Sequence, residues 1–109
     1  MMSLTIKDLM GKMPGAFIPE KAAGMEAVIQ FHFTGDQASD WYVTIKDDAC
    51  SAEGGTFDNP TMSLTADGQD YIDVVTGKMD AMKAFMQGKL KLAGDLNLAM
   101  KMTSFFKMN

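Results

Sequence analysis

Residues 84–95 read Ala84-Phe85-Met86-Gln87-Gly88-Lys89-Leu90-Lys91-Leu92-Ala93-Gly94-Asp95 and decide the fold, because they join several elements in one register. Gly88 is expected to end a short helix, since glycine commonly stops helices. Residues 89–92 then alternate between lysine and leucine, which is the period of a half-buried strand. Gly94 and Asp95 close that strand and begin a helix from about Leu96. The stretch therefore predicts helix, strand and helix in succession.

Two short helices are predicted in and just before this stretch. Asp67 is expected to be the N-cap of the first helix, with Asp70 near its third position, and Gly77 is expected to end it. Asp80 is expected to cap the second helix. Both helices carry apolar residues at helical spacing, namely Tyr71, Ile72, Val74 and Val75 in the first and Ala81, Met82, Phe85 and Met86 in the second.

Farther upstream the apolar residues alternate with a period of two, which predicts half-buried strands. The turn-like Gly35-Asp36-Gln37 separates the first two runs, and a turn at Asn59-Pro60 precedes the last. Residues 49–55 are mostly small and predict a short edge strand. The alternating apolar residues are Ala27, Ile29, Phe31 and Phe33, then Trp41, Val43 and Ile45, then Met62, Leu64 and Ala66.

The chain opens with apolar residues spaced as in one short amphipathic helix, namely Leu4, Ile6, Leu9 and Met10. Gly11 or Pro14 is expected to end that helix. The predicted order is therefore a helix, a run of strands, two helices, a strand and a helix. Because no repeat or linker interrupts the sequence, residues 1–109 are predicted to form a single domain that combines helices and a sheet.

Composition excludes several classes of protein. The formal net charge of −4 argues against nucleic-acid binding through a basic surface. No run approaches the roughly 20 apolar residues that a membrane span requires. Cys50 is the single cysteine, and neither a secretory signal nor a peroxisomal tripeptide is recognised, so we expect a cytoplasmic protein. The outlying count is 12 methionines, whose flexible side chains fit ligands of variable shape.

The sequence supplies little for catalysis. His32 is expected on the polar face of a strand. An alternative hypothesis is an enzyme that uses His32 or Cys50, but the two residues would form a catalytic pair only if the strand register happened to bring them together. The absence of a clustered His/Cys set excludes a structural zinc site. Met79, Met82 and Met86 alternate with apolar neighbours, which favours a core or cavity lining over a copper site. We therefore expect no catalytic residue, metal or cofactor.

Residues 84–95, together with residues 59–65 and 71–78, resemble the sterol carrier protein 2 domain family. The resemblance continues through residues 98–101 and, more loosely, back through residues 41–45. It implies an α+β fold in which a five-stranded mixed sheet, with helices packed on one face, encloses an apolar tunnel. It also implies noncatalytic binding and carriage of fatty acids, fatty acyl-CoA or sterol-like lipids. Peroxisomal residence and thiolase chemistry are not implied for this chain.

On this resemblance, apolar residues of the strands and helices are expected to line the lipid site. Those from the strands are Phe31, Phe33, Trp41, Val43, Met62 and Leu64, and those from the helices are Ile72, Val75, Met82, Phe85, Met86, Met100, Phe105 and Phe106. A lipid headgroup would require lysines at the mouth, namely Lys78, Lys89, Lys91 or Lys101, although Lys89 and Lys91 are alternatively solvated residues of the polar sheet face. Transient contact with a membrane is also expected.

The C-terminal helix leaves a second function open. Its apolar residues form two stripes, so the helix has to cover more than a sheet. That extra partner is another helix, another chain or a bound apolar ligand. The alternative function is therefore a protein-interaction or dimerisation module, and the chain is expected to be a monomer or a weak dimer. The two stripes consist of Leu96, Ala99, Met100, Thr103 and Phe106, and of Leu98, Met102 and Phe105.

Overall fold

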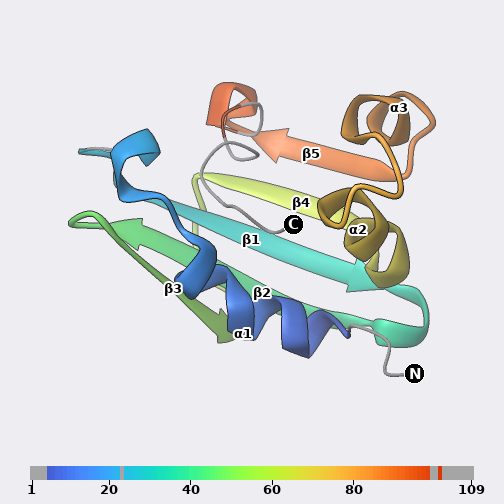
Figure 1. Ribbon diagram of the computed structural model, residues 1–109, viewed down its shortest axis with the longest axis horizontal. Helices are drawn as coiled ribbons and strands as arrows, with labels where there is room; N and C mark the ends of the chain where they lie inside the picture. Colours follow the sequence, from blue (N-terminus) through green and yellow to red (C-terminus); the bar gives the residue numbers. More distant parts are fainter. Residues whose placement is uncertain (1–4, 23, 99–100, 102–109) are drawn as a thin grey trace.

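The computed structural model describes residues 5–22, 24–98 and 101. Its helices and strands alternate along the chain largely as the sequence predicts (Figure 1). The elements are α1 (Ile6–Ala16), η1 (Pro19–Ala22), β1 (Ala27–Thr34), η2 (Gly35–Gln37), β2 (Ser39–Lys46), β3 (Ala49–Gly54), β4 (Met62–Asp67), α2 (Gly68–Val75), α3 (Ala81–Met86) and β5 (Leu90–Gly94).

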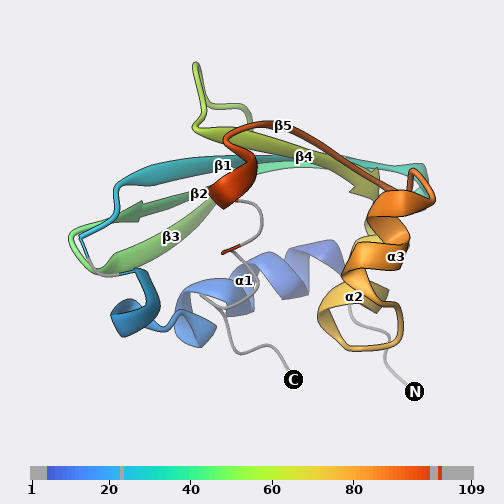
Figure 2. The same ribbon diagram turned by 90° about the horizontal axis from the view of Figure 1, so that it is seen from above.

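The strands form one five-stranded sheet in the order β3-β2-β1-β4-β5. β1 and β4 pair in parallel, and the other neighbouring strands pair antiparallel. Figure 2 shows α1, α2 and α3 beneath one face of this sheet, while the loop that follows β3 rises on the other side. The expected α+β fold, a five-stranded mixed sheet with helices on one face, is confirmed.

We call the sheet face beneath the helices the covered face and the opposite one the open face. Strand register places alternate residues on each, so that Phe31 of β1 lies between Trp41 of β2 and Leu64 of β4 on the covered face. Each strand thereby contributes apolar side chains to one layer. That layer contains Ala27, Ile29, Phe31, Phe33, Trp41, Val43, Ile45, Cys50, Ala52, Met62, Leu64, Ala66, Leu90 and Leu92.

Helix α1 packs its apolar stripe into this layer. Thr5 begins the helix through a capping box, in which its hydroxyl accepts the Asp8 backbone N–H at 3.1 Å and the Asp8 carboxylate accepts the Thr5 N–H at 3.2 Å. The stripe recurs at helical spacing and is buried, and it consists of Ile6, Leu9, Met10 and Met13.

Helix α1 does not end at Gly11 or Pro14 as the sequence predicts, but continues to Ala16. Pro14 lacks a backbone N–H, so it removes only one hydrogen bond from the last turn of the helix. Burial of Met13 holds that turn against the core, and the Phe17 N–H then donates to the Pro14 carbonyl at 3.4 Å. Packing therefore outweighs the local signal of a proline.

The predicted caps of the other helices are confirmed. The Asp67 carboxylate accepts the backbone N–H groups of Gln69 and Asp70, and the Asp80 carboxylate accepts that of Lys83 at 3.0 Å. Asp95 accepts the Asn97 N–H at 3.0 Å, and residues 96–98 and 101 are helical. The remaining residues of the predicted C-terminal stripes lie outside the described ranges. Among the residues that the structure describes, no helix is both long and apolar enough to cross a membrane.

Candidate functional site

The covered face collects the apolar residues that the sequence assigns to the strands of the site. Neighbouring strands bring them side by side, since Phe31 pairs with both Trp41 and Leu64, and Ile29 pairs with Met62. All but the half-buried Trp41 are buried beneath the helices. The buried members of the predicted lining are Phe31, Phe33, Val43, Met62 and Leu64 from the sheet and Ile72 from α2.

An aromatic cluster occupies the part of this layer below α2. The rings of Phe31 and Phe33 stack with centroids 5.6 Å apart, and the Tyr71 ring lies 5.5 Å from Phe31 and 5.3 Å from Phe33. Burial raises the pKa of the Tyr71 hydroxyl above its usual value, so the group stays neutral. Tyr71 belongs to the predicted helical stripe but is not among the site residues that the sequence predicts.

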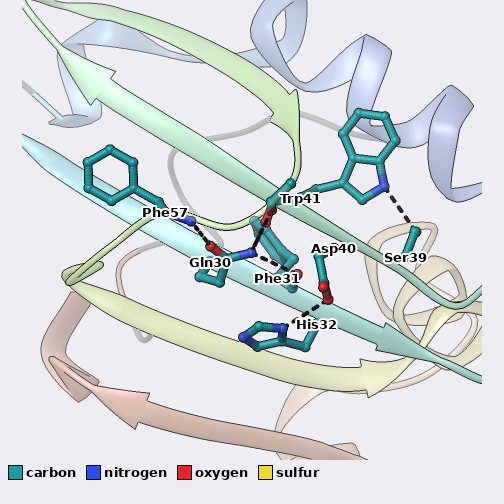
Figure 3. A network of polar contacts seen from close by, with 8 residues as sticks. Gln30, Phe31, His32, Ser39, Asp40, Trp41 and Phe57 are labelled. Carbon is teal, nitrogen blue, oxygen red and sulfur yellow. Dashed lines mark hydrogen bonds and ion pairs between the residues drawn. The ribbon is translucent and has the colours of Figure 1, made fainter.

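The margin of the layer is formed by half-buried side chains. Trp41 lies there on β2, where its indole N–H donates to the Ser39 hydroxyl at 3.0 Å (Figure 3). Val75 at the end of α2 and Leu92 on β5 also pack partly exposed against the core. We call these residues the rim: they leave the layer partly open to solvent at its margins, and Trp41 and Leu92 lie on opposite sides of it, with Phe31 and Leu64 between them.

The predicted residues of α3 have a different position. Met82, Phe85 and Met86 are 59%, 46% and 77% exposed, so in this structure they lie on the surface rather than inside the apolar layer. The residue that α3 buries is Ala84. A helix of six residues has few positions that face the core, and in α3 the buried position is occupied by an alanine. Whether these three side chains bind lipid stays a prediction, and Met100, Phe105 and Phe106 lie outside the described residues.

The four predicted headgroup lysines are exposed and do not converge on one point. Lys78 lies between α2 and α3, and Lys89 directly precedes β5. Lys91 lies on the open face, because it pairs with Thr65 and alternates with the covered Leu92. Lys101 lines a small pocket instead. A role of these lysines in headgroup binding stays a prediction.

That pocket lies where the chain enters β1 and leaves β5. Its volume is about 100 Å³, and Glu26, Asp95, Asn97 and Lys101 contribute polar groups to its wall. Sites for small molecules usually measure about 300–1,000 Å³, so this pocket is too small for a whole fatty acid. The expected tunnel is not shown by the described residues, and it stays a prediction.

The open face carries a polar network that the sequence does not predict. Gln30 points to this face yet is buried, and its polar atoms are satisfied there: its amide N–H groups donate to the carbonyls of Trp41 and Gly55, both at 3.0 Å, and its carbonyl accepts the Phe57 N–H at 2.7 Å (Figure 3). The loop after β3 is thereby held over β1 and β2. No local pattern signals such a contact, since Gln30 and Phe57 are far apart in the chain.

His32 and Cys50 are separated by the sheet. His32 lies on the open face, as predicted, and its Nδ1 is 2.9 Å from the Asp40 carboxylate, with both side chains nearly half exposed. Cys50 pairs with Ile45 on the covered face, where burial raises the pKa of its thiol to about 11. The thiol is therefore protonated at neutral pH, and the two residues do not form a nucleophile and base pair.

Comparison with known proteins agrees with this architecture. The chain is 30% identical over 106 residues to hydroxysteroid dehydrogenase-like protein 2 of Danio rerio, covering 94% of this chain and 25% of that protein. It thus spans about a quarter of the length of this relative.

Solved structures share the fold. Palmitated sterol carrier protein 2 like 2 of Aedes aegypti matches with a TM-score of 0.73 at 24% identity, covering 93% of each chain. The stereoselective inverting sec-alkylsulfatase Pisa1 of Pseudomonas sp. matches with a TM-score of 0.83 at 18% identity, covering 95% of this chain and 16% of that one. The model of the SCP-2 sterol transfer family matches residues 15–107. The chain therefore belongs to the SCP-2 sterol transfer family.

Proposed function

We propose that this chain binds and carries apolar lipids on the covered face of its sheet, without catalysing a reaction on them. The observation that carries this proposal is the chemistry of the interior. Among the residues that the structure describes, every buried side chain of the covered face and its helices is apolar or aromatic, and the one buried polar side chain, Gln30, belongs to the open face. Such an interior favours an acyl chain or a sterol-like skeleton and disfavours any polar or charged substrate.

Family membership supports the same function. A related solved protein of Aedes aegypti is described as palmitated, and its chain matches this one over nearly the full length of both. Fatty acids, fatty acyl-CoA and sterol-like molecules share the long apolar body that the covered face would bury. Burial of about a dozen methylenes yields on the order of 10 kcal/mol before the entropic costs of binding are subtracted. Micromolar affinity is therefore within reach.

Side chains that can change shape would make room for the ligand. Met10 and Met13 of α1 and Met62 of β4 are buried in the apolar layer. Methionine has several rotatable bonds and adapts its shape more readily than a branched side chain. We propose that these residues move aside when an acyl chain enters between the sheet and the helices, and that the half-buried rim at Trp41, Val75 and Leu92 lies along the edge of the site.

The polar groups of the chain support a noncatalytic role. His32 and Cys50 lie on opposite faces, and burial keeps the thiol protonated. The relative from Danio rerio is about four times as long as the shared region, so any activity of that protein can reside outside it. We therefore assign lipid carriage, rather than turnover, to the domain itself.

Trp41 provides a direct test, because it is the only tryptophan and lies on the covered face. The purified chain is titrated with a polyene fatty acid that absorbs where tryptophan emits, and the emission of each is recorded. We expect energy transfer from Trp41 to the fatty acid that saturates near one fatty acid per chain. Unlabelled palmitate, palmitoyl-CoA or cholesterol should compete for the site and reverse the transfer, each according to its affinity. Absence of transfer, together with absence of an extractable lipid in native mass spectra, would refute lipid carriage.

A further inference from the structure

Helix α3 presents its large apolar side chains to solvent and its small ones to the fold. Met82, Phe85 and Met86 are exposed at positions one turn apart, whereas Ala84 is fully buried. Side chains three and four residues apart lie on the same side of a helix, so the three exposed ones form one continuous apolar patch. We call it the α3 patch. Contiguous exposed apolar side chains of this kind make the α3 patch a candidate interaction surface.

The sequence around the α3 patch is basic, although the whole chain is acidic. Residues 78–91 contain four lysines and a single acidic residue, for a formal charge of +3, while the chain as a whole carries −4. The single acidic residue, Asp80, is engaged as the helix cap through the Lys83 backbone N–H. Lys78, Lys83 and Lys89 are exposed beside the patch. Exposed lysines therefore lie within or close in sequence to α3, in a segment whose formal charge is opposite in sign to that of the whole chain.

Apolar side chains surrounded by lysines match the surface of an anionic membrane. Phenylalanine and methionine can enter the boundary between headgroups and acyl chains, while lysine heads remain among the phosphates and carboxylates of the lipids. We propose that the α3 patch docks the protein on membranes that contain anionic lipids. The proposal rests on the function proposed above and extends it, because a lipid carrier has to exchange its cargo with a membrane.

The position of α3 suits this role. The Lys89 backbone N–H donates to the Ala84 carbonyl at 2.9 Å, so α3 is held directly at the start of β5. Figure 2 shows α3 and α2 together at one end of the sheet, on the side of the covered face. A membrane in contact with the α3 patch would therefore lie at the end of the sheet where α2 packs on the apolar layer, and an acyl chain could pass between membrane and protein there.

Vesicle flotation tests the docking surface. The full chain is mixed with vesicles of phosphatidylcholine alone or with about 30% phosphatidylserine, and the bound fraction is measured at low and high salt. We expect binding to the anionic vesicles that high salt weakens. The double variant Phe85→Ser, Met86→Ser should lower it at least tenfold, and Lys83→Glu should lower it about fivefold or more. The matched control Phe57→Ser, an exposed phenylalanine on the open face, should bind like the unmodified chain.

The possible failures can be told apart. Equal flotation of the unmodified chain and the α3 variants, or no flotation at all, would overturn the docking proposal. The proposal of lipid carriage would not be affected by that result, because it is tested separately by uptake of the polyene fatty acid from solution. If the unmodified chain floats with anionic vesicles but takes up no polyene fatty acid, lipid carriage would be overturned instead. A concentration-dependent dimer that the α3 variants abolish, without vesicle binding, would assign the α3 patch to a protein partner and overturn membrane docking. Circular dichroism and thermal unfolding check that every variant remains folded.

Discussion

The backbone N–H of Phe57 donates to the side-chain carbonyl of Gln30 across 2.7 Å, which ties the loop after β3 to the central strand of the sheet. The Gln30 amide completes the tie by donating to Gly55 and Trp41 on the same side. We expect Gln30→Ala to lower the free energy of unfolding by about 1–3 kcal/mol, because buried partners lose their hydrogen bonds. Urea unfolding measures the change, with Thr44→Ala on the same face as control. Equal stability of the two variants would show that the loop needs no such anchor.

Gly94 and Gly88 form a matched pair for a test of close backbone approach. Both have positive φ, 91° and 79°. A Cβ at Gly94 would lie 2.7 Å from the Thr61 carbonyl oxygen, whereas a Cβ at Gly88 would meet nothing within 4 Å. Replacement by alanine at Gly88 should cost about 1–2 kcal/mol for the backbone conformation alone, and at Gly94 distinctly more. Unfolding midpoints of the two variants give the difference. If Gly88→Ala proved the more destabilising variant, the close approach of Gly94 to Thr61 would not determine the cost of a side chain at that position.

The stability of the fold should decline in alkaline solution. Burial raises the pKa of the Cys50 thiol from 9.0 to about 11 and also raises that of the Tyr71 hydroxyl. Above about pH 9 the unfolded chain loses these protons while the folded chain retains them, so the unfolding free energy falls as pH rises towards the folded pKa values. Denaturant unfolding at about pH 8 and pH 10.5 measures this slope. Cys50→Ala and Tyr71→Phe together should flatten it, and an unchanged slope would place its origin in other groups.

Leu92 and Ala93 are neighbours on β5 with opposite orientations. Leu92 pairs with Leu64 on the covered face, whereas Ala93 pairs with Ser63 on the open face. We expect Leu92→Lys to weaken uptake of the polyene fatty acid at least tenfold, because an ammonium group would enter the edge of the proposed site. Ala93→Lys adds the same charge to the same strand and should leave uptake unchanged. Similar losses in both variants, with both still folded, would move the lipid site away from the covered face.

Local features of this fold could be predicted from the sequence. The Asp67 and Asp80 caps depend on neighbours within three residues, and the alternation along β1 reflects which face water reaches. The same alternation predicted that Phe31 and Leu64 lie on the apolar face of the sheet, and both are buried there, while their contact with a lipid stays a prediction. The mixed five-stranded form of the sheet followed from the family resemblance rather than from any local period of the sequence.

Other features depend on contacts between distant residues and could not be predicted in this way. Helix α1 passes Pro14 because Met13 is buried against the core, and Gln30 is buried because a distant loop folds over it. The outward direction of Phe85 depends on how closely a short helix approaches the fold, where only alanine faces inward. Apolar spacing alone does not say which side of a six-residue helix meets the core.

The parallel pairing of β1 with β4 has a consequence for how the protein folds. Ile29 lies beside Met62 in this ladder, and the chain between these two residues contains the whole of β2 and β3. Hairpins such as β1–β2 close over short distances, but the parallel ladder requires a long excursion to be ordered first. We expect it to form late and to set the folding rate. The chain would then assemble as an N-terminal meander and a C-terminal half, joined along one seam in the middle of the sheet.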